Sequence, residues 1–171
     1  MTPIPYLVTP PASLPVTLSE MKAHLRVVHA DDDADIAAKQ AGAVAMLDAW
    51  GGLLGRCIMP QTWAIDVIGP GPHVLPFPDA SGVTAEVDGE PAQVDVVRMA
   101  IGQVAAVRDV PTDAAVTIRA TYGLSLERLG AAQSLIKLMV QREYDMLAGP
   151  DYDAITRSID ALIGAIRWRR M

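Results

Sequence analysis

The chain has little cysteine and few aromatic residues. It contains one cysteine and one phenylalanine, and aromatic residues make up 5% of 171 residues, whereas hydrophobic residues make up 51%. A lone Cys57 cannot form an internal disulfide, so nothing indicates an oxidising compartment, and we expect a buried structural thiol. With 26 alanines, the core is predicted to be aliphatic and closely packed, in a chain long enough for one ordinary domain with a helical extension.

The sequence also lacks an excess of cations and any long apolar run. Lys and Arg number 14 against 20 Asp and Glu, giving a net charge of −6. Such a chain is unsuited to binding nucleic acid over its whole surface, because that binding depends on cations that neutralise the phosphates. The sequence has no run of 18 or more apolar residues, so it predicts no membrane span. It also has no basic segment followed by an apolar one, so it predicts no signal peptide. We therefore expect a protein made in the cytoplasm that has no membrane partner.

Motifs for catalysis are missing as well. The three histidines form no metal-binding pattern, and no serine elbow, phosphate loop or dinucleotide fingerprint occurs. The acidic run that begins at Asp31 starts like a calcium loop, but its sixth position is Ile36 and its twelfth is Gly42, so helix capping is the better interpretation. We predict no catalytic residue, no metal site and no cofactor. Catalytic groups brought together from distant loops remain an alternative.

Five prolines within residues 1–16 predict an extended arm instead of a helix. The arm carries Ile4, Tyr6, Leu7 and Val8, which is enough apolar surface to pack on another element. Two interpretations stay open. The arm lies on its own domain, or it reaches a neighbouring subunit as an inter-subunit arm.

Two helices are predicted after the arm. Thr17 and Glu20 have the spacing of a capping box, so a short helix should cover about 18–28, with Leu18, Met21, Leu25 and Val28 on one face. A second helix should run from the acidic run to about residue 55, where glycines end it. Its stripe has spacings of 4, 3, 4, 3 and 4 and comprises Ile36, Gln40, Ala43, Leu47, Trp50 and Leu54.

Residues 61–122 change to short alternating runs separated by turns, which predict five or six strands. Asp88-Gly89 between two such runs is a strong hairpin signal. Val116, Ile118 and Ala120 alternate with polar residues, as in a half-buried strand. We expect a small antiparallel sheet or sandwich inserted between helices.

Helical periodicity returns over 126–147, with Ser125 available as a cap. A final helix, capped by Asp151 or Asp153, carries Ile155, Ile159, Leu162 and Ile166. The predicted class is α+β, with an N-terminal helical pair, a central small antiparallel sheet and two C-terminal helices. The predicted organisation is an arm (1–16), a helical core domain (17–147) with a β insertion at about 60–122, and a C-terminal helix with a basic tail (148–171).

The last eight residues, 164–171, hold three arginines and no acid, so they carry +3. One interpretation is favourable placement of arginine at a helix C-terminus. The other is a docking peg, in which apolar anchors and arginines contact a partner, because Trp and Arg are enriched in interface hot spots. The peg residues are Ile163, Ile166, Arg167, Trp168, Arg169 and Arg170.

Several phrases of the sequence resemble the head–tail connector, or adaptor, family of long-tailed bacteriophages and gene transfer agents. They are PVTLSEMKAHLRV at residues 15–27 followed by the acidic run, then AWGGLLGRCIMP at 49–60, and QTWAID at 61–66. The order of the later segments, ATYG at 120–123 and QREY at 141–144, fits as well. The resemblance covers most of the chain from about Leu14.

That resemblance implies a structural role without catalysis. Members are ring-forming subunits, commonly twelve, that dock beneath the portal protein in the particle neck, extend the DNA channel and support the next tail component, the stopper. It would place the peg in the portal and the arm on a neighbouring copy, with DNA passing through the lumen without tight binding. A monomeric protein-binding module and a small hydrolase are the alternatives.

Overall fold

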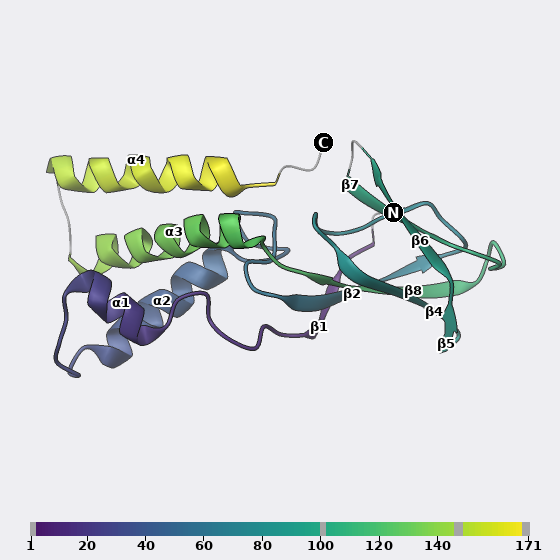
Figure 1. Ribbon diagram of the computed structural model, residues 1–171, viewed down its shortest axis with the longest axis horizontal. Helices are drawn as coiled ribbons and strands as arrows, with labels where there is room; N and C mark the ends of the chain where they lie inside the picture. The colour runs from purple at the N-terminus through teal and green to yellow at the C-terminus, as the bar shows by residue number, and fades with distance from the viewer. Residues whose placement is uncertain (1–2, 100–101, 146–148, 169–171) are drawn as a thin grey trace. The chain divides into compact units, whose positions relative to one another are not determined.

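The computed structural model describes residues 3–99, 102–145 and 149–168. They form a mixed α+β fold in which one short strand precedes two helices, a series of antiparallel strands follows, and two further helices come last (Figure 1). This is the class that the sequence predicts. The described residues divide into two compact units. One is helical (13–58 and 125–167), and the other is built from strands (3–12, 59–124 and 168).

The helical unit contains four helices: α1 (Leu18–Leu25), α2 (Asp33–Leu47), α3 (Leu126–Tyr144) and α4 (Gly149–Ile166). α3 packs against both α2 and α4, and Figure 1 shows α3 and α4 running alongside each other. Most buried side chains come from one face of α2 and one face of α3, and Ile159 and Ile166 of α4 join them. The predicted aliphatic stripes therefore face the core of this unit.

Two glutamines hold the segment that precedes α1. Gln40, buried within the apolar stripe of α2, donates its side-chain amide to the carbonyl of Val16, and Gln133 of α3 donates to the carbonyl of Pro15 at 2.7 Å. The capping box is confirmed, because Thr17 accepts a hydrogen bond from the Glu20 amide while the Glu20 carboxylate accepts from the Thr17 amide. The start of α1 is thus fixed by both local and distant contacts.

Helices α1 and α2 end earlier than the sequence predicted. α1 stops at Leu25 because Arg26 takes a left-handed conformation (φ 59°), so Val28 does not lie on the buried face and is 95% exposed. α2 stops at Leu47 instead of near residue 55. There the Asp48 carboxylate accepts a hydrogen bond from the Ile58 amide at 2.7 Å, which folds the glycine-rich segment back.

Because the chain folds back after Leu47, the last two residues of the predicted α2 stripe, Trp50 and Leu54, are not on the helix. Leu54 is buried because the amides of Leu53 and Leu54 donate to the carbonyls of Met46 and Leu47, whereas Trp50 is exposed on the turn. α4 begins at Gly149, before Asp151 and Asp153, so neither aspartate caps it. Ser125 occupies the N-cap position of α3, but its side chain makes no capping hydrogen bond.

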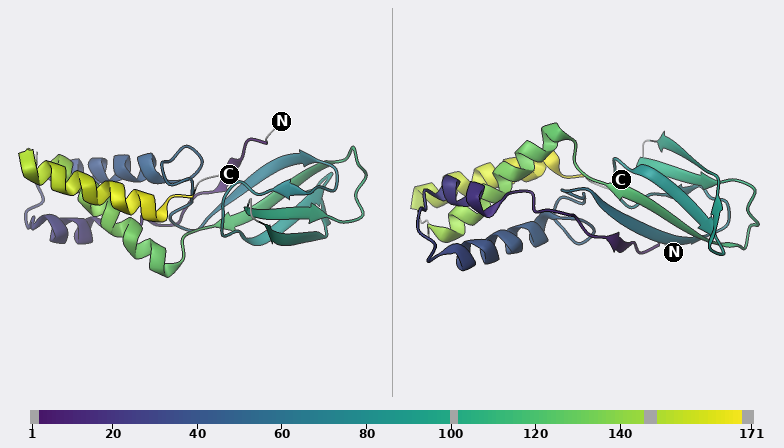
Figure 2. Two further views of the ribbon diagram at one scale, coloured as in Figure 1. Left: turned by 90° about the horizontal axis from the view of Figure 1, so that it is seen from above. Right: turned by 60° about the horizontal axis from the view of Figure 1, so that its bottom comes forward.

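The strand unit contains eight strands in two antiparallel sheets (Figure 2). The larger has the order β1-β2-β8-β4-β5, and the smaller has the order β3-β7-β6. The strands are β1 (Tyr6–Thr9), β2 (Gln61–Ile68), β3 (His73–Val74), β4 (Ser81–Val87), β5 (Glu90–Ala92), β6 (Val94–Met99), β7 (Gly102–Val107) and β8 (Ala115–Tyr122). Seven of them follow residue 60, more than the five or six predicted, because residues 90–92 after the Asp88-Gly89 turn also pair.

The two sheets share one core. Ile65, Ala85 and Ile118 from the larger sheet pack with Ala105 and Val107 from the smaller one. Elsewhere in the strand unit, Phe77 makes edge-to-face contacts with Trp63 and Tyr122, with ring centroids 5.3 and 5.1 Å apart. The predicted sandwich is therefore present, and the only phenylalanine of the chain lies at the centre of its aromatic cluster.

Local predictions within the sheets are confirmed. Asp88 and Gly89 both have positive φ and join β4 to β5, with Val87 opposite Glu90, as expected for a two-residue hairpin. On β8, Val116, Ile118 and Ala120 are buried, whereas the residues between them face away from the core.

Candidate interaction surfaces

The C-terminal segment is partly engaged within its own chain. Ile166 is 2% exposed and Ile163 is half-buried, so both belong to the packed face of α4, whereas Arg167 is exposed. Trp168 is half-buried, and its ring lies against the backbone of Gly102, where an added Cβ would be 3.5 Å from Trp168 Cζ2. The predicted peg residues Arg169 and Arg170 lie outside the described residues.

The N-terminal arm forms the edge strand β1, which pairs antiparallel with β2 of the same chain. Its register shifts between Leu7 and Thr9, which indicates a bulge. The predicted arm residues Ile4, Tyr6, Leu7 and Val8 remain exposed by 75, 43, 45 and 43%. The arm thus lies on its own sheet and still presents apolar side chains to the outside.

Tyr6 fixes this strand to the outer face of the larger sheet. Its hydroxyl donates to Asp66 Oδ1 at 3.2 Å, and Thr117 donates to the same oxygen at 2.8 Å. Partial burial, and the hydrogen bond to the Asp66 carboxylate, raise the pKa of Tyr6. On the same face Arg119 pairs with Glu86. This face is therefore polar: Asp66 accepts hydrogen bonds from two hydroxyl groups, and Arg119 and Glu86 form an ion pair.

A third surface was not singled out from the sequence. Strand β6 is an edge of the smaller sheet, and Val96, Val97 and Met99 on it are exposed by 39, 54 and 50%. The sequence could have indicated this surface through the adjacent Val96 and Val97. Neighbouring residues of a strand point to opposite faces, so two consecutive valines place an apolar side chain on each face. The helical unit also exposes Met46, Trp50 and Leu53 around the end of α2.

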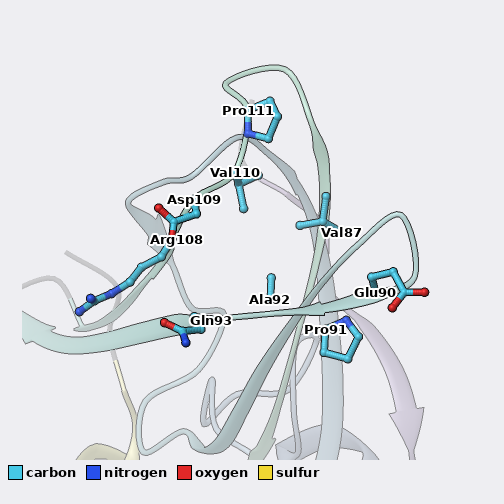
Figure 3. Close-up of a pocket in the computed structure, with 9 residues that line it drawn as sticks. All are labelled: Val87, Glu90, Pro91, Ala92, Gln93, Arg108, Asp109, Val110 and Pro111. Atoms are coloured by element: carbon cyan, nitrogen blue, oxygen red, sulfur yellow. The ribbon is translucent and has the colours of Figure 1, made fainter.

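A pocket of about 370 Å³ lies beside the β4–β5 hairpin (Figure 3). Figure 3 shows Val87, Ala92 and Val110 turned toward its middle, whereas the side chains of Arg108 and Glu90 extend away from it. The Arg108 guanidinium pairs with Asp95 at 2.5 Å, which raises the pKa of Arg108. Two carboxylates, Glu90 and Asp109, are among the lining residues, and Figure 3 shows them on opposite sides of the pocket.

The residues considered for metal binding have other roles. Among the described residues, no group of three or more His, Cys, Asp or Glu side chains could hold a metal ion. In the acidic run, Asp33 pairs with Lys22, Asp35 pairs with Lys39, and Asp32 accepts a hydrogen bond from Tyr144. The carboxylates at this helix start are thus balanced by cations and a hydroxyl from the same unit. Cys57 is buried, as predicted.

No described helix is long and apolar enough to cross a membrane. No family model matches the chain, and no curated protein matches its sequence.

Among solved structures, the chain is similar to a chain of the neck of an empty GTA particle, determined with C6 symmetry. The TM-score is 0.67, and the match covers 98% of this chain and 97% of that chain at 18% sequence identity. At this identity the likeness establishes a shared fold. It extends over both units, so the matched fold includes the helical unit as well as the strand unit.

Proposed function

We propose that this protein is a head–tail connector subunit in the neck of a phage-like particle or gene transfer agent. The observation that carries the proposal is the fold shared with a chain of a GTA particle neck over 98% of the length. The sequence phrases that resemble the connector family support it independently. In this role the protein works by contact with other subunits and performs no catalysis.

The subunit would assemble into a ring, commonly of twelve copies, a number compatible with the C6 symmetry of the similar neck structure. Heterologous contacts close into a ring when the rotation between neighbours divides evenly into a full turn. Twelve copies with a net charge of −6 would carry −72. Negative charge along the lumen repels phosphates, so DNA would pass through the channel without tight binding.

The partners in this proposal are the portal protein on one side and the stopper, the next neck component, on the other. The C-terminal segment is proposed to dock on the portal. Because Ile166 is buried in the helical unit, its part would be to hold the end of α4, together with Ile163. Arg167 and Trp168, with Arg169 and Arg170, would supply the contacts, since Trp and Arg contribute strongly to interface energies.

The arm residues Ile4, Tyr6, Leu7 and Val8 are proposed to contact a neighbouring copy. Their exposure on an edge strand supports this, because edge strands and apolar groups are the parts of a sheet that other chains bind most readily. Within its own copy β1 would keep its pairing with β2.

Labelling tests the function directly. We expect a tag on this subunit to appear at the neck in micrographs of particles, and we expect deletion of its gene to yield separate heads and tails. A label found elsewhere, or joined heads and tails after deletion, would contradict the proposal.

The docking role needs a separate test. Replacing Arg167, Arg169 and Arg170 with alanine should reduce co-sedimentation with portal rings at least tenfold and leave the fold unchanged. The matched control is Arg157→Ala, an exposed arginine in the middle of α4. Deleting residues 164–171 is a poorer test, because it removes the buried Ile166. Equal binding by the triple variant and the control would refute the docking role.

A further inference from the structure

Exposed apolar side chains in the strand unit are concentrated on two elements. Among the described large hydrophobic residues of this unit that are exposed, all except Ile68 belong to the arm or to β6. They are Ile4, Tyr6, Leu7 and Val8 on the arm and Val96, Val97 and Met99 on β6. Two separate apolar surfaces on one unit are what a heterologous contact between identical subunits requires.

Both elements are also sheet edges. In the described chain, β1 pairs only with β2, and β6 pairs only with β7, so each strand has one side without a strand partner. An edge strand presents backbone amides and carbonyls that can pair with another chain. The two strands belong to different sheets, so each is available independently of the other.

The charged side chains of β6 are paired within the same copy. Natural edge strands are often guarded by charged side chains that repel or desolvate an incoming strand. Here Asp95 pairs with Arg108 at 2.5 Å, and Arg98 lies 3.4 Å from Asp79, so both charges have partners within the same copy. A partner strand therefore does not need to supply charges of its own.

The arm can be such a partner strand because it carries no charged side chain: the first charged residue in the sequence is Glu20. We propose that the outer edge of β6 in one copy binds residues 4–9 of the next copy by strand addition. This rests on the ring proposed above and names the surface that receives the arm. The larger sheet of one subunit then continues into the smaller sheet of its neighbour.

The alternative of β6 pairing with β6 would be symmetric and would end at a dimer, whereas arm-to-β6 pairing repeats around a ring. A contact of four to six residues buries less surface than a stable dimer needs. Closure of the ring and docking on a partner protein would strengthen the association between subunits, because linked contacts reinforce one another. The isolated subunit should therefore associate weakly.

Disulfide trapping can detect such a weak contact. Leu7→Cys and Val97→Cys are made in separate full-length chains of different mass, mixed and mildly oxidised; the only native thiol, Cys57, is buried. We expect mixed dimers at least tenfold above a mixture of Val97→Cys with Ile68→Cys. Ile68 is the control because it is 70% exposed in the same unit but lies on β2. A yield equal to that control, or mostly homodimers of the Val97→Cys chain linked at position 97, would overturn the proposal.

A charge variant gives a second readout. Val97→Lys should raise the concentration needed for self-association, followed by light scattering, at least tenfold, because lysine on a strand edge opposes pairing. Ile68→Lys should leave it unchanged, and circular dichroism confirms that both variants fold. If Val97→Lys associates like the unaltered chain, the inference fails, whereas a label at the neck would still support the connector function.

Discussion

The Tyr144 hydroxyl donates a hydrogen bond of 2.6 Å to Asp32 Oδ2, joining residues 112 positions apart. Tyr144 ends α3, and Asp32 precedes the first residue of α2. The bond therefore ties the C-terminal end of one helix to the N-terminal end of another within the helical unit. It also gives the acidic run at 31–35 a structural role.

This bond predicts a pH dependence of stability. The hydrogen bond to Asp32 and partial burial raise the pKa of Tyr144 to about 12 from its ordinary 10.0. A raised pKa means that the stabilisation is complete below pH 10 and is lost as the pH rises through about 12. Tyr144→Phe should lower the melting temperature near neutral pH and remove this loss at high pH. Ultraviolet titration of the tyrosines provides the check, and a Tyr144 pKa near 10 would contradict the bond.

The capping box of α1 predicts an effect at low pH. Hydrogen bonds from the Thr17 amide and then its hydroxyl lower the pKa of Glu20. That stabilisation is present above the ordinary Glu pKa and is lost as the pH falls through the lowered value. Thr17→Ala should cost about 1 kcal/mol at pH 7 and less in acid. Urea unfolding at several pH values measures this, with Ser19→Ala on the exposed side of α1 as control.

Two adjacent glycines should respond differently to alanine. A Cβ on Gly52 would overlap the carbonyl oxygens of Leu47 and Asp48, whereas a Cβ on Gly51 would meet nothing within 4 Å. Gly52→Ala should therefore destabilise the turn after α2 by about 1–3 kcal/mol, the usual cost of overpacking. Gly51→Ala should change the free energy of unfolding by less than about 0.5 kcal/mol. Equal thermal shifts for the two variants would contradict this turn.

Helix α2 should tolerate a stabilising change. Gly42 lies in its interior with open space around the position of a Cβ. Gly42→Ala should raise the free energy of unfolding by about 0.5–1 kcal/mol, because alanine loses less backbone entropy on folding. Thermal unfolding of the single variant tests this, and a lower melting temperature would show that the position is crowded.

The aromatic cluster predicts the largest effect in the strand unit. Phe77 is 1% exposed and contacts Trp63 and Tyr122 edge to face. Phe77→Ala should cost about 3–5 kcal/mol, and the near-ultraviolet circular dichroism of the cluster should weaken. Leu126→Ala, at a side chain that is 88% exposed, should have almost no effect.

Short-range features were predictable because they depend on neighbouring residues. Thr17 and Glu20 gave the capping box, and Asp88-Gly89 gave the hairpin, since only local backbone geometry decides them. Periodicity likewise placed Ile36, Ile118 and Ile159 in the core. The helix ends were less predictable, because the Asp48 bond to Ile58 and the conformation of Arg26 do not appear in the periodicity.

The candidate interaction surfaces were likewise predictable only in part. Sequence alone indicated the class of fold, the extended arm and the basic C-terminal tail, because composition, proline content and apolar spacing are properties of the chain itself. Only the tertiary structure decided that β1 pairs with β2, that β6 is an exposed edge, and that Trp168 lies against Gly102. Pairing and burial depend on which distant segments the fold brings together, and no local pattern of residues specifies those contacts.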